Sequence, residues 1–473
     1  MIYKTKPWKH QRQALEYLYQ RDIGALYTDM GTGKTKVMID LMRNRKDFRR
    51  VLIVGTVKAC EVWEEEIKIH GKASKFRVIQ LVNLDMDKKI NKLEKELEMA
   101  KEDADDVTTV IIVNYESVWR KPLDKVLLRK KKTAIDTVIC DESHKIKAPA
   151  SKCSRYLARI GKIVPHRYLV TGTPTSESPM DVYAQYRFLD PSIFGTNYTS
   201  FCDLYQNVDV RISSRVGYTV LDKKHPYKNL DDLKEKMFSC AFCVASSVKL
   251  PPTKSINVEF ELEDRVSKLY KEMKDEGIVE LNGGVLDITT ILSMVLREQQ
   301  LTSGYLPVED EDGEVKIVNV SKARLNAFKE LLNTFDKDEP IVVFARYKKD
   351  LKNIRKACKQ LGISYSELSG DHDNLKEWKD GDTIVLGVQY TSGSESINLT
   401  RARICVFYSL HHSYALYKQA RKRTHRPGQT RKCKYYTLIA KCKGITTIDE
   451  KMVEARRCKQ DVVDYIMEGR LND

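Results

Sequence analysis

The chain has no long apolar stretch. None of its hydrophobic runs approaches the roughly 20 residues that a membrane-spanning helix needs. Residues Met1–Pro7 also lack the apolar core of a secretory signal. Both absences favour a cytoplasmic protein without a membrane partner, in the host cytoplasm if the source is viral. A hydrophobic content of 42% with 31% charged residues is typical of a globular chain and argues against intrinsic disorder.

A metal-binding cysteine pattern is missing as well. The eleven cysteines are scattered and odd in number, which favours reduced thiols over a disulfide framework. Cys240 and Cys243 form the only C-x-x-C pair, and no second pair or histidine cluster lies at zinc-finger spacing. We therefore expect these two residues to be buried thiols and not zinc ligands.

Positive charge, by contrast, is in excess. The chain has 82 lysines and arginines against 66 carboxylates, which gives a formal net charge of +16. Such a surplus favours a polyanionic partner, nucleic acid first, although it can also serve solubility. Because the surplus is spread along the chain, it suggests a basic groove more than a basic tail.

Two blocks of alternating strand-like and helix-like segments indicate the fold. Short, continuous apolar runs rich in β-branched residues are typical of strands buried on both faces of a parallel sheet. Such runs occupy 24–27, 51–54, 76–82, 109–113, 137–140 and 168–170 in the first block, and 341–344, 383–388, 404–408 and 435–439 in the second. Between the blocks, turns and two helices, at about 262–275 and 286–302, replace the alternation.

Two other segments predict helices with one apolar side. In the segment 11–19, the apolar residues Ala14, Leu15, Leu18 and Tyr19 share one helical face. The segment 88–106 predicts a charged helix, which suits an ordinary surface helix better than a coiled-coil partner site.

The predicted fold class is therefore α/β, with two parallel-sheet lobes joined by a linker and small, mostly helical insertions. The N-terminal lobe covers 1–249, including a protrusion or connector at 190–249. The C-terminal lobe covers 250–473, including a helical insertion at 262–320. A proline pair at 251–252 stiffens the linker and excludes helix there. Two lobes joined in this way imply a cleft between them.

A glycine-bearing turn links the first predicted strand to a helix. Strand, turn and helix in this order are typical of a phosphate-binding loop, because glycines let backbone N–H groups surround phosphate oxygens at a positive helix end. Lys34 would reach the β- and γ-phosphates, and Thr35 would bind Mg²⁺. Thr28 stands where the first glycine of the motif is expected. The residues predicted to surround the nucleotide are Asp29, Met30, Gly31, Thr32, Gly33, Lys34 and Thr35.

Two carboxylates follow the predicted strand at 137–140. Asp141 and Glu142 would lie on the rim where ligands bind in open parallel sheets. Asp141 can bind Mg²⁺, and Glu142 can orient or deprotonate an attacking water. The hydroxyls of Thr171–Pro174, after the next strand, could relay the state of a γ-phosphate. Together with the phosphate loop, the acidic pair predicts hydrolysis of ATP.

A basic stretch at 419–429 is the most informative part of the second block. Arg423 and Arg426 lie three residues apart, on one face if the segment is helical. Their guanidinium groups could neutralise γ-phosphate charge in the transition state, an effect of about 10³–10⁵ in rate where it has been measured. The alternative is a helix that faces solvent or nucleic acid.

These motifs and their order resemble the superfamily-two helicase-like ATPases of the switch/sucrose-non-fermenting (SWI/SNF) type. Gln11 matches the adenine-reading glutamine of that family, and Asp29–Thr35 resembles its motif I. Its other motifs are matched at 52–67 (Ia), 114–116 (Ib), 141–147 (II), 169–174 (III), 343–344 (IV), 397–400 (end of V) and 419–429 (VI).

The resemblance implies two RecA-like lobes that clamp double-stranded DNA while ATP and Mg²⁺ bind between them. The hydrolytic set that it implies is Lys34, Thr35, Asp141, Glu142 and, as fingers from the second lobe, Arg423 and Arg426. Further nucleotide contacts are implied for Gln11, Asn398 and Gln419.

The chain departs from the family at several places. Ser392–Ser396 stands where the family is richer in glycine, which bears on the nucleotide contact of Ser396. Phe242–Ser246 stands where a basic pair usually precedes the proline link. The long accessory domains of the family are missing, so the chain resembles the bare motors of bacterial or viral genomes. We expect a monomer, and the sequence indicates no particular protein partner.

Six residues at predicted strand ends are candidates for phosphate-backbone contacts, which give affinity without sequence information. They are Thr56, Lys58, Asn114, Tyr115, Arg346 and Ser392. For each of them, an ordinary loop role is an equal alternative.

The sequence therefore predicts an ATP-driven translocase that double-stranded DNA stimulates. A strand-separating helicase on DNA or RNA is the alternative among enzymes. A nucleotide-gated nucleic-acid-binding module with little hydrolysis is the alternative of another class. The intact Glu142, Arg423 and Arg426 argue against that last class.

Overall fold

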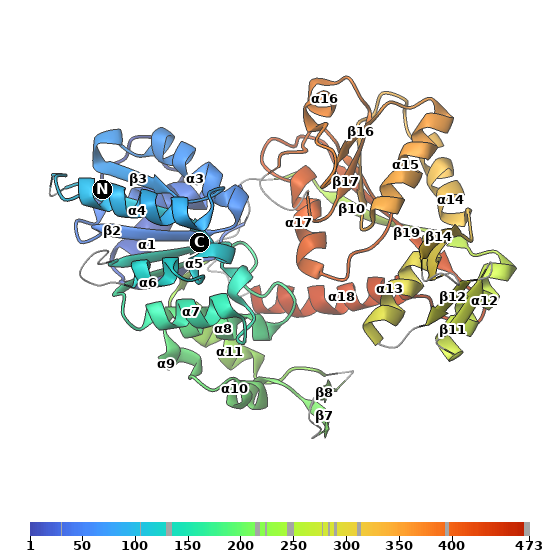
Figure 1. The fold of residues 1–473 in the computed structure, drawn as a ribbon, viewed down its shortest axis with the longest axis horizontal. Helices are drawn as coiled ribbons and strands as arrows, with labels where there is room; N and C mark the ends of the chain where they lie inside the picture. Colours follow the sequence, from blue (N-terminus) through green and yellow to red (C-terminus); the bar gives the residue numbers. More distant parts are fainter. Residues whose placement is uncertain are drawn as a thin grey trace. The chain divides into compact units, whose positions relative to one another are not determined.

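Parallel strands organise each half of the chain. The structure, a computed structural model, divides into two units, Met1–Val248 with Asp461–Asp473, and Lys249–Gln460 (Figure 1). It describes residues 1–473 except 30, 105, 129–134, 213–217, 223–224, 244–249, 277, 282–283, 288–290, 310–313, 393–396 and 468–473.

The first unit is built on a seven-stranded parallel sheet with the strand order β3-β4-β2-β5-β6-β1-β9. The strands are β1 (Ile23–Leu26), β2 (Arg50–Gly55), β3 (Phe76–Gln80), β4 (Thr108–Asn114), β5 (Thr137–Asp141), β6 (His166–Val170) and β9 (Ala241–Phe242). β4 is buried along its whole length, and β1 lies between β6 and β9. The strands predicted in the first block are confirmed, and their unbroken apolar character follows from burial.

Helices surround this sheet. They are α1 (Lys9–Tyr19), α2 (Lys34–Asn44), α3 (Val57–His70), α4 (Met86–Met99), α5 (Tyr115–Val118), α6 (Leu123–Leu127), α7 (Lys152–Gly161), α8 (Val182–Leu189), α9 (Pro191–Phe194), α10 (Tyr198–Tyr205) and α11 (Leu230–Phe238). A separate antiparallel pair is formed by β7 (Val208–Ile212) and β8 (Tyr218–Leu221). Apolar side chains of α1, α2 and α3 pack in one core with alternate residues of β2 and β4.

Two helix predictions need correction. Tyr19 is 39% exposed, although the pattern placed it on the buried face with Leu15 and Leu18. It is the last residue of α1, where the helix leaves the core. The helix predicted to continue to 106 ends at Met99, and Asp103 beyond it accepts hydrogen bonds of 2.6 and 2.7 Å from Arg77 of β3. This ion pair fixes the chain after α4 in a non-helical turn.

The second unit has a six-stranded parallel sheet with the order β10-β19-β18-β15-β17-β16. Its strands are β10 (Thr253–Glu261), β15 (Ile341–Ala345), β16 (Tyr365–Leu368), β17 (Val385–Gln389), β18 (Ile404–Phe407) and β19 (Cys433–Lys441). Its helices are α12 (Asp264–Glu276), α13 (Ile291–Thr302), α14 (Ala323–Asn333), α15 (Lys348–Leu361), α16 (Leu375–Asp380) and α17 (Tyr414–Thr424). The last helix, α18 (Ile448–Met467), begins in this unit, and its residues from Asp461 on belong to the first unit. Alternate residues of β15 separate two cores. Val342 and Phe344 pack with α16 and α17, whereas Ile341 and Val343 pack with α14 and α15.

The insertion expected at 262–320 is only partly helical. α12 and α13 confirm its two helices, but an antiparallel sheet accompanies them, formed by β11 (Ile278–Leu281), β12 (Gly284–Asp287), β13 (Tyr305–Glu309) and β14 (Val315–Asn319). β10 is a further strand that the sequence reading missed. Its apolar residues Ile256, Val258 and Phe260 recur every second position, which is the signal of a strand with one buried face.

No disulfide joins any of the eleven cysteines, and Cys240 and Cys243 are buried. Among the described residues, no helix combines the length and the apolar character that crossing a membrane requires.

A buried ion pair joins several elements of the second unit. The guanidinium of Arg324 on α14 pairs with Asp449 of α18, and both side chains are at most 2% exposed. Arg324 also donates to the carbonyl oxygens of Thr302, at 3.0 Å, and of Tyr408, and Asp449 accepts from the backbone N–H of Ala440 at 3.0 Å. Because both charges are buried and hydrogen-bonded, removal of one partner leaves the other uncompensated, at a cost of about 3–5 kcal/mol.

Arg324→Met should therefore destabilise the second unit. A loss of that size predicts amide exchange in β18 and β19 that is roughly 100-fold faster or more, measured by hydrogen exchange and mass spectrometry. Lys329→Met, on the same helix but half-buried and bonded only to Gln360 at 3.4 Å among the described residues, is the matched control and should leave exchange in these strands nearly unchanged. Equal effects of the two substitutions would contradict the stabilising role of the pair.

Candidate active site

The predicted phosphate-binding loop connects β1 to α2, and its carbonyl oxygens bind the side chain of Lys34. Lys34 Nζ donates to the carbonyl oxygens of Thr28 and Asp29, each at 3.0 Å. Gly31 and Gly33 have φ angles of +77° and +75°, a conformation that side chains disfavour. Lys34 is the first residue of α2, so the unpaired N–H groups of that helix start at the loop. Met30 lies outside the described residues.

α1 supports this loop through two side chains. Gln11 Nε2 donates to the carbonyl oxygen of Thr32 at 2.9 Å, and His10 Nε2 lies 3.0 Å from the same oxygen. A Cβ atom on Gly33 would lie 2.3 Å from Gln11 Nε2, so a side chain there would displace the amide of Gln11 from the loop. The amide of Gln11 therefore fixes the loop, and the reading of adenine by this residue stays a prediction.

Thr28 takes the place of the first glycine without opening the loop. Its side chain is buried, and its hydroxyl lies 2.9 Å from the hydroxyl of Thr32. The Thr32 hydroxyl donates to the carbonyl oxygen of Asp29 at 2.7 Å. The two threonines thus satisfy each other inside the turn, which explains why a hydroxyl residue is accommodated at this position.

The carboxylate of Asp141, at the end of β5, is buried and firmly held. Trp63 Nε1 donates to Oδ2 at 2.8 Å, and the N–H of Glu142 donates to Oδ1 at 2.9 Å. The hydroxyl of Tyr115 donates to the Asp141 carbonyl oxygen at 2.7 Å. Burial raises the pKa of Asp141 to about 6, and the charge of Glu142 acts in the same direction. The Trp63 hydrogen bond and the positive charge of Lys34 act against this rise in pKa, so the loop lysine and this carboxylate share one electrostatic site.

Glu142 has a strained backbone. Its φ of +51° lies in the left-handed region, which costs a non-glycine residue of order 1–3 kcal/mol. Its carboxylate Oε2 lies 3.3 Å from Nδ1 of His144, and that nitrogen is 3.1 Å from the hydroxyl of Thr171 after β6. The carboxylates of Glu142 and Asp141 thus have different partners, His144 for the one and Trp63 for the other, so the adjacent groups can take different roles.

The groups at this sheet edge fit a magnesium nucleoside triphosphate. β1, β5 and β6 are parallel neighbours, so the phosphate loop, the acidic pair and Thr171 follow carboxyl ends on the same edge. The lysine and the α2 N–H groups suit phosphate oxygens. Asp141 and the hydroxyl of Thr35 are hard oxygen ligands of the kind that Mg²⁺ prefers, and they would hold the ion.

The second unit carries its own predicted residues on and after α17. Gln419 and Arg423 are buried in that helix. Arg426 follows the helix, and its Nη1 donates to the carbonyl oxygen of Ile397 at 3.4 Å, close to the exposed Asn398. Burial lowers the pKa of the Arg426 guanidinium. The structure thus gathers these four residues in one region of the second unit, and Ser396 lies outside the described residues.

The nucleic-acid candidates of the first unit follow β2 and β4. Thr56 caps α3, with its hydroxyl accepting from the N–H of Ala59 at 3.3 Å, and Lys58 is exposed in the first turn of that helix. Asn114 and Tyr115 are buried, and the Tyr115 hydroxyl is the one bonded to Asp141.

The candidates of the second unit follow β15 and β17. Arg346 donates to the side chain of Gln299, and its N–H donates to the hydroxyl of Ser409 at 2.8 Å. Ser392 is half-buried in the turn after β17. Contact of any of the six candidates with nucleic acid stays a prediction.

Three residues support the site through contacts that the sequence did not predict, although Trp63 and Gln429 lie in the segments matched to motifs Ia and VI. Trp63 holds Asp141, His10 holds the phosphate loop, and Gln429 fixes the turn after α17 by donating to the carbonyl oxygens of Thr400 and Ala402 at 3.0 and 2.9 Å. The signal for Trp63 is its rarity, since the chain has four tryptophans. A buried indole N–H needs an acceptor. No spacing rule points to the acceptors of His10 or Gln429.

The fold and the site define a two-lobed α/β protein with a phosphate-binding loop and an Asp-Glu pair. The model of the SNF2-related domain matches residues 10–304, and that of the helicase conserved C-terminal domain matches residues 323–428. The chain therefore belongs to the SNF2-related family, as the motif order indicated.

Known proteins similar to the chain are longer. An uncharacterized ATP-dependent helicase of Mycoplasma pneumoniae is 23% identical over 95% of this chain and 40% of its own length. The mouse SWI/SNF-related matrix-associated actin-dependent regulator of chromatin subfamily A member 1 is 23% identical over 96% and 43%. A solved structure, the Sulfolobus solfataricus SWI2/SNF2 ATPase core in complex with dsDNA, is 19% identical, with a TM-score of 0.41, over 99% of this chain and 94% of that one. The chain spans about two fifths of the length of the first two relatives.

The raised pKa of Asp141 predicts a pH dependence of stability. Because the folded-state pKa of about 6 lies above the ordinary value of 3.8, the ionised carboxylate destabilises the folded chain above pH 6, and this effect disappears as the pH falls towards 4. The shift corresponds to roughly 3 kcal/mol between these limits. In urea unfolding with EDTA, wild type should lose more stability than Asp141→Asn between pH 4.5 and 7.5.

For each protein, the free energy of unfolding at one pH is compared with that at the other. The pH-independent effect of the new amide in Asp141→Asn on hydrogen bonding therefore cancels. Asp103→Asn is the control, because hydrogen bonds from Arg77 lower the pKa of Asp103 and move its titration below this window. That variant should keep the wild-type profile. Parallel profiles for wild type and Asp141→Asn would show that Asp141 is ionised throughout.

Proposed function

We propose that the chain is an ATP-driven translocase on double-stranded DNA. The observation that carries this proposal is the buried, doubly hydrogen-bonded Asp141 carboxylate in the electrostatic range of Lys34, since this pairing suits a magnesium-bound triphosphate. The net charge of +16 supports a polyanionic partner. The names of the relatives, an ATP-dependent helicase and a regulator of chromatin, agree with a motor on DNA.

Hydrolysis would depend on positioning and charge. Lys34 and the α2 N–H groups bind and orient the phosphates, and Glu142 orients the attacking water and accepts its proton. His144 and Thr171, next to the Glu142 carboxylate, fix its direction. Bound Mg²⁺, held by Asp141 and Thr35, would neutralise charge on the β- and γ-phosphates.

Arg423 and Arg426 complete the site in this proposal. Their positive charges stabilise the γ-phosphoryl group in the transition state once the two units close on ATP. Turnover then opens the units again, and each cycle moves the contacts along the DNA backbone. Such coupling requires that ATP and DNA both bind the closed state better than the open state.

Removal of the loop lysine or of the general base tests the hydrolytic set. ATP hydrolysis should rise many-fold with duplex DNA, more than with single-stranded DNA or RNA, and should fall at least about 100-fold in both Lys34→Ala and Glu142→Gln. Glu142→Gln should still bind ATP, whereas Lys34→Ala should bind it weakly. Lys92→Ala, exposed on α4, is the control and should hydrolyse ATP like wild type.

Strand-displacement assays with the same nucleic acids distinguish a translocase from a helicase. Displacement of a triplex-forming strand without separation of the duplex identifies a translocase, and separation of the duplex identifies a helicase. Negligible hydrolysis with all three nucleic acids would overturn the motor and favour a nucleotide-gated binding module.

Arg426→Ala tests the finger assignment. Because the guanidinium would act on charge that develops in the transition state, turnover should fall about 10³-fold while the dissociation constant of ATP changes little. Steady-state kinetics and equilibrium binding of a fluorescent ATP analogue separate the two effects. Lys432→Ala, an exposed cation in the following segment, is the control. Turnover that survives in Arg426→Ala removes this residue from the active site.

A further inference from the structure

The solvent face of α15 carries a row of positive charge. Lys348, Lys352, Arg355, Lys356 and Lys359 are all exposed. At 3.6 residues per turn these five positions lie within an arc of about 100°, and with a rise of 1.5 Å per residue the row is about 16 Å long. We call these five residues the α15 strip. None of the predicted motifs includes its lysines.

Acidic groups do not cancel the strip. Asp350 is the single carboxylate of α15, and it is buried against the sheet, where it accepts from the hydroxyl of Ser409 at 2.6 Å. The ion pairs of this face join Lys348 to Asp371 at 2.8 Å and Arg355 to Glu367 at 2.7 Å. Asp371 also lies within the electrostatic range of Lys352. Lys356 and Lys359 have no ion-pair partner within the described chain.

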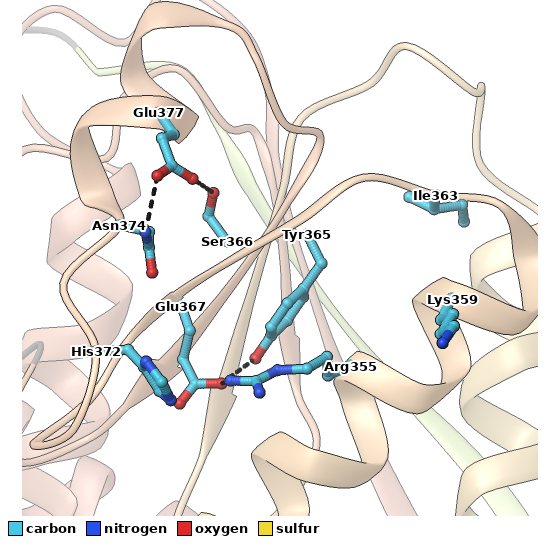
Figure 2. A pocket seen from close by; sticks show the side chains of 9 residues that line it. All are labelled: Arg355, Lys359, Ile363, Tyr365, Ser366, Glu367, His372, Asn374 and Glu377. Carbon is cyan, nitrogen blue, oxygen red and sulfur yellow. Dashed lines mark hydrogen bonds and ion pairs between the residues drawn. The ribbon is translucent and has the colours of Figure 1, made fainter.

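An open cavity beside the strip carries charges of both signs. Figure 2 shows Arg355 and Lys359 at this cavity of about 490 Å³, together with Glu367 and Glu377. Glu367 accepts from Arg355 and, at 2.9 Å, from the hydroxyl of Tyr365. The negative charges of Glu367 and Glu377 disfavour binding of an anion in the cavity. Phosphate groups would therefore approach from the solvent side, where Lys352, Lys356 and Lys359 lie.

The strip continues an edge that already holds nucleic-acid candidates. β15 ends at Ala345, Arg346 follows, and α15 begins at Lys348. The helix then runs along the face of the sheet that it shares with α14 (Figure 1). A duplex that contacts the carboxyl edge of this sheet could thus also lie along α15. Its charge density, one phosphate per about 1.7 Å of axis, complements a row of this length.

We propose that the α15 strip is a second contact surface for the phosphate backbone of double-stranded DNA, outside the family motifs. This proposal rests on the proposed function, because the duplex is the one on which the motor acts. The occupant is a regular polyanion, since the strip offers spaced positive charges and no apolar pocket. Such contacts raise affinity and its salt dependence without selecting a sequence.

The test is the triple substitution Lys352→Glu, Lys356→Glu and Lys359→Glu, measured without nucleotide. Duplex binding, followed by fluorescence anisotropy, should weaken at least 10-fold at low salt. The slope of log K against log salt concentration should shrink by about 2–3, or about 0.9 for each phosphate that the variant no longer neutralises. Lys254→Glu, Lys271→Glu and Lys274→Glu together change the net charge equally at exposed sites and should keep the wild-type slope. Equal slopes for the two triple variants would overturn the proposal.

Lysine footprinting on wild type gives a readout that does not depend on the folding of a variant. Duplex DNA should protect Lys352, Lys356 and Lys359 from acetylation and leave Lys271 and Lys274 reactive. Protection by polyglutamate but not by duplex DNA would overturn the proposal and assign the strip to an acidic protein. The two proposals fail separately. A chain that binds duplex through the strip but never hydrolyses ATP refutes the motor alone, whereas stimulated hydrolysis with an unprotected strip refutes the surface alone.

Discussion

The hydrogen bonds on Asp141 are the constraint on which the first unit depends. A carboxylate at the end of a buried strand is costly unless donors surround it. Trp63 of α3 and the N–H of Glu142 supply those donors, and Tyr115 fixes the backbone of the same residue. These bonds tie β5 to the segments after β2 and β4. Burial outweighs the effect of these bonds on the acidity of the carboxylate and raises the pKa of Asp141 to about 6. The ionised carboxylate therefore lowers the stability of the fold, and a cation bound by Asp141 would offset this cost.

Sequence patterns predicted the strands and the motif residues because both are local. The first sheet follows from continuous apolar runs, and the phosphate loop follows from glycines that need positive φ. The partners of these residues are not local. Trp63 lies 78 positions from Asp141, and no periodicity relates them. The strand β10 was missed for a different reason. Its alternating apolar residues indicate a strand, but the prolines before it suggested only a linker. In the insertion after β10, the two helices have a readable period, whereas the four-stranded sheet depends on pairing between distant segments.

The second unit obtains its rigidity from side chains that bind carbonyl oxygens. Arg324 binds the backbone at the ends of α13 and β18, and Gln429 binds the turn before β18 and the last residue of α17. Each of these groups satisfies several buried acceptors at once, which stabilises loops that have few apolar residues of their own. The backbone that carries Arg423 and Arg426 is therefore held in place. Rigid presentation matters for groups that act on developing charge, because an error of about 1 Å can cost roughly 100-fold in rate.

Arginine and lysine have different places in this unit, and the difference agrees with their chemistry. Arg324 is buried in an ion pair, Arg421 lies 4.2 Å from the ring centre of Tyr435, and Arg401 lies 5.0 Å from that of Trp378. A planar guanidinium suits such fixed, directional contacts. The lysines of the α15 strip are exposed instead, and an ammonium group is a hydrated point charge on a flexible stem. A contact of this kind holds a phosphate weakly and exchanges it for the next at little cost. Loose lysine contacts therefore suit a surface along which DNA moves, whereas arginine suits the places where the fold must stay still.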